Sequence, residues 1–352
     1  MPKEEENKEK KRNPLWNLFK EEWKHLGSRR KNFVGYMSMF FIAGIISLMS
    51  PLVVGYIFNS IQQTISSDSE LRKLIFMIFM LLALQIGFWI FHGTGRIFEQ
   101  ITGFYVHRNY TNDKISKVLE LPIRWHKDNH SGDTIDKINR GRGSLEEFSK
   151  GRTYEVLNAF LRIFGSLIIL FFIDKRIALF AFVFSIGVIL FSVSMDKVLV
   201  KYYKAMNKFS NKLASSVYDY LGNIFTVITL RLKKTVSKEI DMRLMASLNV
   251  EKKALIIEEA KWAIISIVIT LMTVLALSYK AYTSYHTTGI ILIGTLYMVY
   301  GYLNRVGETF YQIAWMYSNM VRSNAKIEGA YPIDEEFDKI KGKIKGDRKS
   351  VV

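Results

Sequence analysis

Long apolar runs alternate with charged segments along most of this chain. A run at Thr153–Ile173 is interrupted only by Glu155 and Arg162. Five further runs contain no charged residue: Phe33–Phe58, Leu74–Gly95, Ile177–Met195, Trp262–Tyr279 and Ala281–Asn304. Each is close to or longer than the ~20 residues that a helix needs to cross ~30 Å of hydrocarbon. The pattern predicts an all-α, polytopic membrane protein with spans at about 33–58, 71–95, 153–173, 177–196, 262–280 and 286–306.

The basic residues predict the orientation of the chain. Of its 49 Lys and Arg residues, 41 fall in four segments: 1–32, 107–152, 196–261 and 322–352. Because basic loops stay on the cytoplasmic side, both termini of this multi-pass protein are expected in the cytoplasm, with the spans in the cell membrane. The net charge of +17 is spread over these four segments, so the sequence argues against a nucleic-acid-binding module.

The first 31 residues divide into two parts. Residues 1–13 consist mainly of Lys and Glu and are expected to be disordered. Residues 14–31 are expected to form an amphipathic helix at the membrane surface. Lys and Glu lie opposite a predicted apolar face formed by Trp16, Phe19, Trp23 and Leu26.

Three stretches have a helical composition over more residues than a membrane requires. No proline occurs from Leu71 to Leu121, and residues 177–220 and 235–279 have a similar composition. A continuous helix of about 50 residues is ~75 Å long, more than twice the ~30 Å of the hydrocarbon layer. Long helical legs on the cytoplasmic side are therefore expected.

The polar stretch LPIRWHKDNHSGDTIDKINRGRGSLEEF, residues 121–148, has several interpretations. His126 and His130 have the i, i+4 spacing of a metal pair, but no further ligand set accompanies them. Asp128 or Asp133 would be the candidates for general acid–base catalysis, although the neighbouring sequence is polar. A solvated basic loop is a third interpretation.

Four local motifs, in their order along the chain, resemble the type 1 transmembrane domain of an ATP-binding cassette (ABC) exporter. They are SPLVVGYIFNSI in the first span, KVLELPIRWHKDNHSGDTIDKINRG, VYDYLGNIFTVITL, and SNMVRSNAKIEGAYPIDEEF after the last span. Asp219 and Ile228 depart from the family pattern, which usually has Glu and a basic residue at these positions. The resemblance implies that residues 32–328 form this domain.

The same resemblance implies two coupling helices, short segments that dock into a nucleotide-binding domain. The first would include Pro122, Trp125, His126, Asp128 and Gly132, and the second would include Tyr220, Asn223, Ile224 and Phe225. In the first, Trp125 is expected to be an exposed knob, with Pro122 and Gly132 forming the turns at its two ends. Phe225 and Tyr220 are expected to form the second knob.

The nucleotide chemistry is expected elsewhere. No GxxxxGK[ST] motif occurs, so the chain is not expected to hydrolyse ATP by itself, or to hold a metal or another cofactor. Residues 329–352 are expected to be a linker toward a nucleotide-binding domain, downstream or on a separate polypeptide, which would bind ATP and Mg.

A few polar and aromatic residues in or near the spans are candidates for a translocation cavity. They are Gln85, Trp89, His92, Arg96, Glu99, Arg162, Asn304, Arg305, Glu308 and Gln312. Arg96/Glu99 and Arg305/Glu308 are i, i+3 pairs, so the alternative is that they neutralise each other and only stabilise the bundle.

Three functions are compatible with the sequence. The first is the membrane half of an exporter that moves an unknown substrate by alternating access, as a homodimer or heterodimer in contact with lipid. The second is a non-transporting scaffold or receptor. The third is an ATP-independent channel or carrier, for which inverted repeats and broken helices would be expected.

Overall fold

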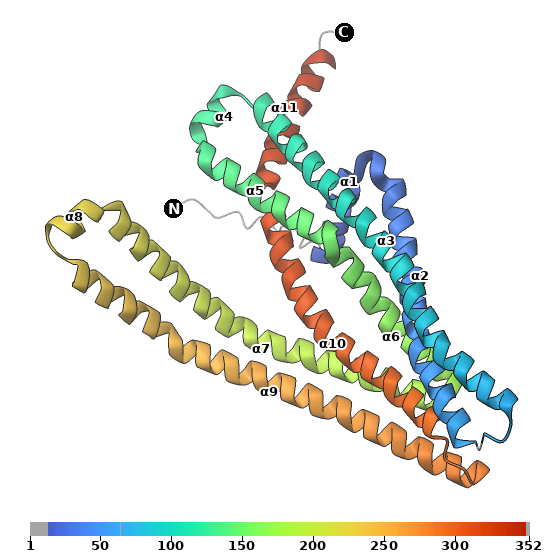
Figure 1. Ribbon diagram of the computed structural model, residues 1–352. Coiled ribbons are helices and arrows are strands. Elements are labelled where there is room, and N and C mark those ends of the chain that lie inside the picture. Colours follow the sequence, from blue (N-terminus) through green and yellow to red (C-terminus); the bar gives the residue numbers. More distant parts are fainter. Residues whose placement is uncertain (1–12, 64, 350–352) are drawn as a thin grey trace. The chain divides into compact units, whose positions relative to one another are not determined.

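The structure, a computed structural model, describes residues 13–63 and 65–349, so nearly all of the segment expected to be disordered lies outside it. Every regular element in this part of the chain is helical, which confirms the all-α prediction. The chain divides into two compact units, Met1–Ile173 with Ile290–Val352, and Asp174–Gly289 (Figure 1).

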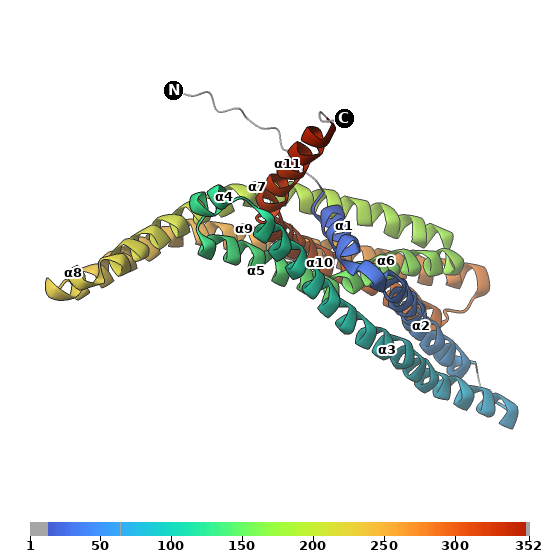
Figure 2. The same ribbon diagram turned by 90° about the horizontal axis from the view of Figure 1, so that it is seen from above.

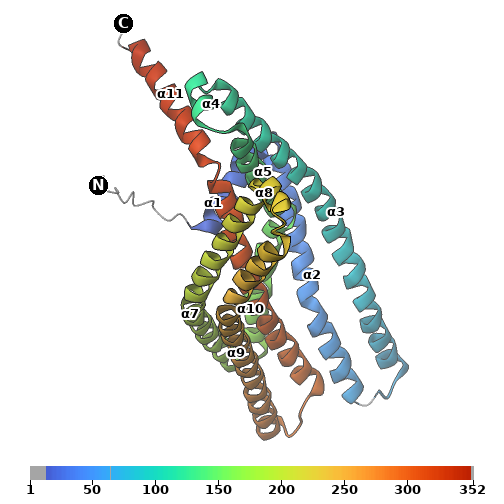
Figure 3. The same cartoon turned by 90° about the vertical axis from the view of Figure 1, so that its left-hand side faces the viewer.

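The first unit contains the long helices α2, α3, α6 and α10 together with short helices at one end. Figures 1 and 3 show α2 and α3 side by side along most of their length, and α10 packs against α2 and α6. The elements are α1 (Pro14–Leu26), η1 (Gly27–Arg29), α2 (Arg30–Gln62), α3 (Asp68–Glu120), α4 (Ile123–Asp128), α5 (Ser131–Glu147), the π-helical turn η2 (Phe148–Arg152), α6 (Thr153–Ile173), α10 (Ile293–Glu328) and α11 (Tyr331–Lys349).

The second unit is a pair of antiparallel helices, α7 (Lys175–Gly222) and α9 (Lys233–Thr288), joined by the short helix α8 (Ile224–Thr229). Figure 2 shows α8 at the tip of this pair. Two ion pairs hold the helices together, Lys280 with Asp174 at 3.0 Å and Lys261 with Asp196 at 2.9 Å. Both connect residues more than 60 positions apart in the sequence, so they define the register of α7 against α9.

Helices α3 and α7 have nearly the lengths that the sequence predicts, whereas α9 continues to Thr288, beyond the predicted residues 235–279. Helix α3 has 53 residues, α7 has 48 and α9 has 56. At 1.5 Å per residue these helices are ~80, ~72 and ~84 Å long, whereas ~30 Å suffices to cross the hydrocarbon layer. Each therefore continues far beyond any membrane that it spans.

Five helical stretches of the described chain are long and apolar enough to cross a membrane. They are Pro14–Gln62, Asp68–Glu120, Ser131–Ile173, Lys175–Gly222 and Lys233–Thr288. Helix α10, which corresponds to the sixth predicted span, has 36 residues but is not among the five. Its length is sufficient, and its polar residues lower its hydropathy.

The predicted start of the last span at residue 286 is wrong. Residues 286–288 complete α9, which ends at Gly289 with a left-handed backbone of φ 71°. A residue without a side chain adopts this conformation at little cost, which is why glycine commonly ends a helix. The chain then enters α10 at Ile293.

Two glycines allow α2 and α10 to approach closely. A Cβ atom placed on Gly294 would lie 1.8 Å from the backbone oxygen of Gly55, and one on Gly55 would lie 2.7 Å from the oxygen of Gly294. Small residues at helix contacts let membrane helices pack backbone to backbone. A methyl group at either position would force the two helices apart.

The variant Gly294→Ala should therefore destabilise the first unit by about 1–3 kcal/mol, the usual cost of overpacking a tight contact. Thermal unfolding in detergent measures this loss. Gly35→Ala in α2 is the matched control, because no atom lies within 4 Å of the added methyl group. Equal melting temperatures for the two variants would contradict the close approach of α2 and α10.

Candidate functional site

Helix α4 connects the ends of α3 and α5, and it is the short transverse helix that the sequence predicts. Its most exposed apolar side chain is Ile123, at 77% exposed. Leu119, near the end of α3, is 76% exposed, and Ile135, near the start of α5, is 58% exposed. Trp125, expected to be the knob, is half-buried against Ile138, Ala330 and Ile333. That expectation is wrong, because the indole packs against a buried cluster from α5 and the start of α11, whereas Ile123 stays exposed.

The turns around α4 also differ in part from the prediction. Pro122 precedes the helix in an extended conformation, as expected. Gly132 does not form the second turn, since it lies in the first turn of α5 with helical geometry. The chain turns instead at Asn129 and His130, both extended, and the Asn129 side chain donates to the Trp125 backbone oxygen at 3.0 Å. His126 and Asp128 are exposed on the surface of α4.

A network of ion pairs around the buried Lys114 joins α11 to the end of α3 that carries α4. The fully buried Lys114 ammonium binds the Asp334 carboxylate, which also accepts from Lys117 at 2.8 Å. Lys117 in turn contacts Asp113 at 2.9 Å. Burial raises the pKa of Asp334, but its bonds to Lys114 and Lys117 outweigh this effect and hold the pKa below its usual range. These ion pairs and the packing of Trp125 hold α4 and α11 against the end of α3.

The second predicted knob lies at the tip of α7 and α9. Phe225 on α8 is 83% exposed, and Ile224 beside it is 37% exposed. Asn223 ends α7, with its side chain donating to the Asp219 backbone oxygen at 2.9 Å, while Tyr220 is half-buried. Further exposed apolar side chains surround Phe225: Tyr218, Leu221, Ile228 and Leu230. The tip is therefore an apolar surface several residues wide.

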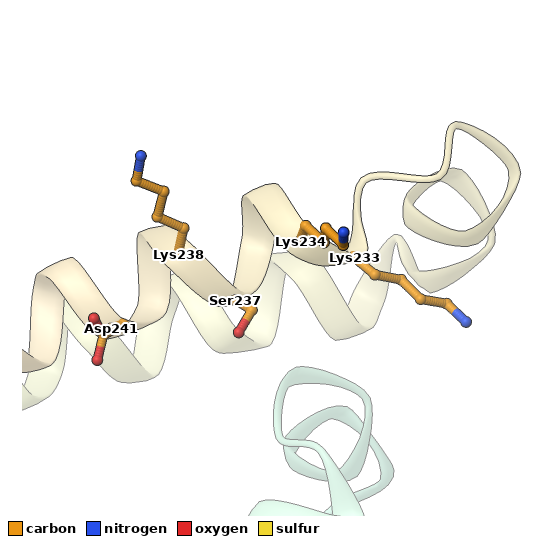
Figure 4. A pocket seen from close by; sticks show the side chains of 5 residues that line it. All are labelled: Lys233, Lys234, Ser237, Lys238 and Asp241. Atoms are coloured by element: carbon orange, nitrogen blue, oxygen red, sulfur yellow. The ribbon is translucent and has the colours of Figure 1, made fainter.

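Basic side chains follow this apolar tip on the first turns of α9. A shallow pocket there is lined by Lys233, Lys234, Ser237, Lys238 and Asp241. Figure 4 shows Lys238 pointing away from Ser237 and Asp241, and Lys233 extending in a third direction. The side chains do not converge on one point, so they do not form a binding site for a single small ligand. This surface is a basic, solvent-exposed region next to the tip.

Helix α1 packs through a more polar face than the sequence predicts. Asn17, Glu21, Glu22 and His25 are buried together with Leu18 and Leu26, whereas Trp16 is 72% exposed and Trp23 is 44% exposed. The prediction that the Glu side chains face away from the apolar side is wrong for Glu21 and Glu22. They find partners in the bundle: Tyr331 donates to Glu21 at 3.3 Å and Thr153 donates to Glu22 at 3.0 Å.

The candidate cavity residues fall into two groups in the first unit. In one group, Arg162 of α6 lies 3.9 Å from Glu308 of α10, and Asn304 donates to Glu308 at 2.9 Å. Arg305 donates to the backbone oxygen of Ser47 at 2.9 Å. The predicted internal pair of Arg305 with Glu308 is not formed, although the structure describes both residues.

In the other group, Arg96 and the fully buried Glu99 form the i, i+3 pair that the sequence predicts. His92 stacks on Phe88 with ring centroids 4.9 Å apart and contacts the edge of Tyr154 at 5.1 Å. Trp89 contacts the same His92 ring. Because Tyr154 lies two helical turns from Arg162 on α6, this helix connects the two groups.

Helix α10 has one buried and one exposed face. Its buried face is apolar, with Met298, Val299, Tyr302, Leu303 and Val306 among its members. At helical spacing on the other face are the exposed residues Tyr297, Tyr300, Asn304, Glu308, Gln312 and Trp315, which we call the α10 stripe. A span-length helix with such a stripe is suited to line an aqueous path. Gln85 is exposed on α3, away from these contacts.

Several residues of these sites were not predicted from sequence. Ile123 on α4 and Leu119 and Ile135 on the adjoining ends of α3 and α5 are exposed, and the alternation of apolar with charged residues in this loop was the available signal. Arg152 was also missed. It pairs with Glu155 at 2.9 Å and lies 4.5 Å from the Trp315 ring, repeating the i, i+3 spacing of Arg96 and Glu99. Among residues 13–63 and 65–349, no three His, Cys, Asp or Glu side chains are grouped as metal ligands.

Comparisons with known proteins agree with this architecture. The family model described as ABC transporter transmembrane region matches residues 33–305. A solved structure titled as a bacterial Atm1-family ABC exporter with ATP bound has the same fold, with a TM-score of 0.67 at 14% identity. The match covers 87% of this chain and 53% of that one, so this chain spans about half of the exporter's length. A comparison with curated proteins gave no match.

The variant Asp334→Asn tests the network between α3 and α11. It leaves the buried Lys114 ammonium without its carboxylate, at a cost of about 3 kcal/mol. Backbone hydrogen exchange over residues 331–341 should therefore accelerate about 100-fold. In the unchanged protein the same acceleration is expected at low pH. Because the pKa of Asp334 is lowered in the folded state, its stabilisation is present above about pH 4 and is lost as the pH falls through the lower folded value.

Asp338→Asn is the matched control, because this carboxylate is exposed on the same helix. It should exchange like the unchanged protein at every pH. Equal exchange in Asp334→Asn and Asp338→Asn would mean that Lys114 and Lys117 do not hold α11.

Proposed function

Because this chain belongs to the family of ABC transporter transmembrane regions, we propose that it is the membrane half of an ATP-driven exporter that works as a dimer. Nucleotide-binding domains, continuous with this chain or on separate polypeptides, bind ATP and Mg and hydrolyse the nucleotide. Their closure moves the spans between an inward-facing and an outward-facing arrangement, which carries a substrate out of the cytoplasm.

The observation that carries this proposal is the apolar tip around Phe225 at the end of α7 and α9. A side chain of this size that is 83% exposed is unusual for a tip surrounded by water. Helix α9 extends roughly 50 Å beyond a ~30 Å hydrocarbon layer. An apolar knob held this far from the membrane is suited to a cleft in a nucleotide-binding domain, which makes α8 a coupling helix.

The first coupling helix in this proposal is α4, with Ile123 as its contact with the nucleotide-binding domain. Trp125 has a different role, because it packs against Ala330 and Ile333 where α10 passes into α11. A displacement of α4 by the nucleotide-binding domain is therefore transmitted through the indole to the end of α10 near Glu328. Since α10 carries the exposed polar stripe, the movement arrives at the face that would line the substrate path.

The proposal includes an orientation of the chain in the membrane, which the basic segments of the sequence support. The ends that carry α4 and α8 face the cytoplasm, and Trp16 and Trp23 of α1 rest at the lipid surface on that side. The α10 stripe leaves polar groups of a span uncovered within its own unit, which favours an assembly with a second, identical or related, transmembrane half. The proposed location is the cell membrane.

Phe225→Asp tests the coupling role. Desolvating a carboxylate in an apolar cleft costs several kcal/mol, so the affinity for the nucleotide-binding domain should fall at least about tenfold. The ATP hydrolysis rate of the assembled complex in lipid vesicles should fall with it. Both quantities are measured with the full complex, and helical content by circular dichroism shows that the variant is folded.

Met245→Asp on the leg of α9 is the matched control. Met245 is 57% exposed but distant in sequence from α8, so its substitution should change neither quantity. If Phe225→Asp binds and hydrolyses as the unchanged complex does, α8 is not a coupling helix. A scaffold or an ATP-independent carrier then becomes the better account.

A further inference from the structure

Two arginines of the first unit lie within predicted spans, Arg162 in residues 153–173 and Arg305 in residues 286–306. Arg162 is about nine residues into α6, and Arg305 is about twelve residues into α10, which places them roughly 13 and 18 Å along their helices. Both positions fall well inside a ~30 Å hydrocarbon layer. A guanidinium at such depth is costly unless water or an anion surrounds it.

The partners of these arginines do not neutralise them. Among the described residues no carboxylate lies within ion-pair distance of Arg305, whose one bond goes to the backbone oxygen of Ser47. Arg162 makes a single loose contact of 3.9 Å with Glu308, whose side chain is 55% exposed and already accepts from Asn304. Of the two cations, only Arg162 therefore has a carboxylate within ion-pair distance, and that carboxylate is partly in contact with solvent.

The other acidic residues in or just beyond the predicted spans already have basic partners. Glu155 and Asp196 lie within the six predicted spans, and Glu99 lies just past the second. Each has its own basic partner: Arg152, Lys261 and Arg96, respectively. A second copy of this chain would bring the same set, with a second Arg162 and Arg305 for its own Glu308. The positive excess at this depth therefore persists in a homodimer.

We propose that Arg162 and Arg305 form an anion subsite on the transport path, which binds the carboxylate, sulfonate or phosphate group of an amphipathic molecule. Guanidinium groups bind such oxyanions through paired, charge-assisted hydrogen bonds. The apolar body of the molecule would lie along Tyr297 and Tyr300, the exposed aromatic residues of the α10 stripe. This inference rests on the proposed function, for which it names the substrate class.

The test compares three fluorescent probes that share a dansyl group and differ in charge: dansylated undecanoic acid, its methyl ester and dansylcadaverine. Binding is measured by anisotropy with the protein in phosphatidylcholine nanodiscs, after subtraction of empty nanodiscs. The anionic acid should bind about tenfold more tightly than the neutral ester or the cationic amine. Arg162→Gln should remove about this tenfold preference.

Further variants separate binding from folding. Arg305→Lys keeps a donor for Ser47 but loses the paired geometry, so it should weaken the acid several-fold in a protein that still folds. Glu308→Gln removes the competing carboxylate and should strengthen the acid several-fold, the opposite of what loss of a structural ion pair would do. Arg72→Gln, which changes an exposed residue near the start of α3, is the control and should have no effect.

Two additions identify the source of the anion. Phosphatidylglycerol in the nanodisc should displace the acid if a lipid headgroup occupies the subsite, and inorganic phosphate should displace it if a free anion does. The proposal is overturned if the acid and its ester bind equally, or if Arg162→Gln leaves the preference intact. Because this assay needs no ATP and no nucleotide-binding domain, such a failure would leave the Phe225 test of the proposed function unaffected.

Discussion

The thickness of the hydrocarbon layer is the constraint on which this structure depends. Lipid offers no hydrogen bonds to the backbone, so a chain that crosses it and is not a closed barrel must do so as helices. About 20 residues suffice for ~30 Å, yet α3 has 53 and α9 has 56. The helical residues beyond those ~20 lie outside the membrane and must be stabilised there by contacts between helices. In the second unit, Tyr203 provides such a contact by donating to Glu258 at 3.0 Å.

In the first unit, the helix ends beyond the hydrocarbon layer pack together in one core, which we call the base. A buried core that includes Leu18, Val106, Leu145 and Met320 joins α1, α3, α5 and α10, and the ion pairs of Lys114 and Lys117 add α11. Such a base is expected to move as a block, because packed cores shift between discrete arrangements and do not deform continuously. A force applied at α4 would reach α10, whose stripe combines aromatic and polar side chains.

Features set by local sequence were predicted well. Apolar runs predicted long helices, five of whose stretches are apolar enough to cross a membrane. The absence of proline predicted the continuous helix α3, and Pro122 predicted the start of α4. Features set by distant contacts were not. Trp125 looked like an exposed knob because its partners, Ala330 and Ile333, lie about 200 residues later in the chain. The buried Glu side chains of α1 were missed for the same reason, since hydroxyl groups from α11 and α6 satisfy them. The pairing of Glu308 with Arg162 likewise needed the position of α6.

The central claim is that α9 leaves the membrane well before it reaches α8. The chain contains no cysteine, so single cysteines at Met245, Ile256, Ile264 and Leu271, all exposed on α9, can each carry a spin label in lipid vesicles. Collisions with a water-soluble nickel chelate should dominate at 245 and 256, and collisions with oxygen at 264 and 271, with the change near Trp262. Oxygen-dominated collisions extending to 245 would mean that the leg lies in lipid, and the account of a coupling leg would be contradicted.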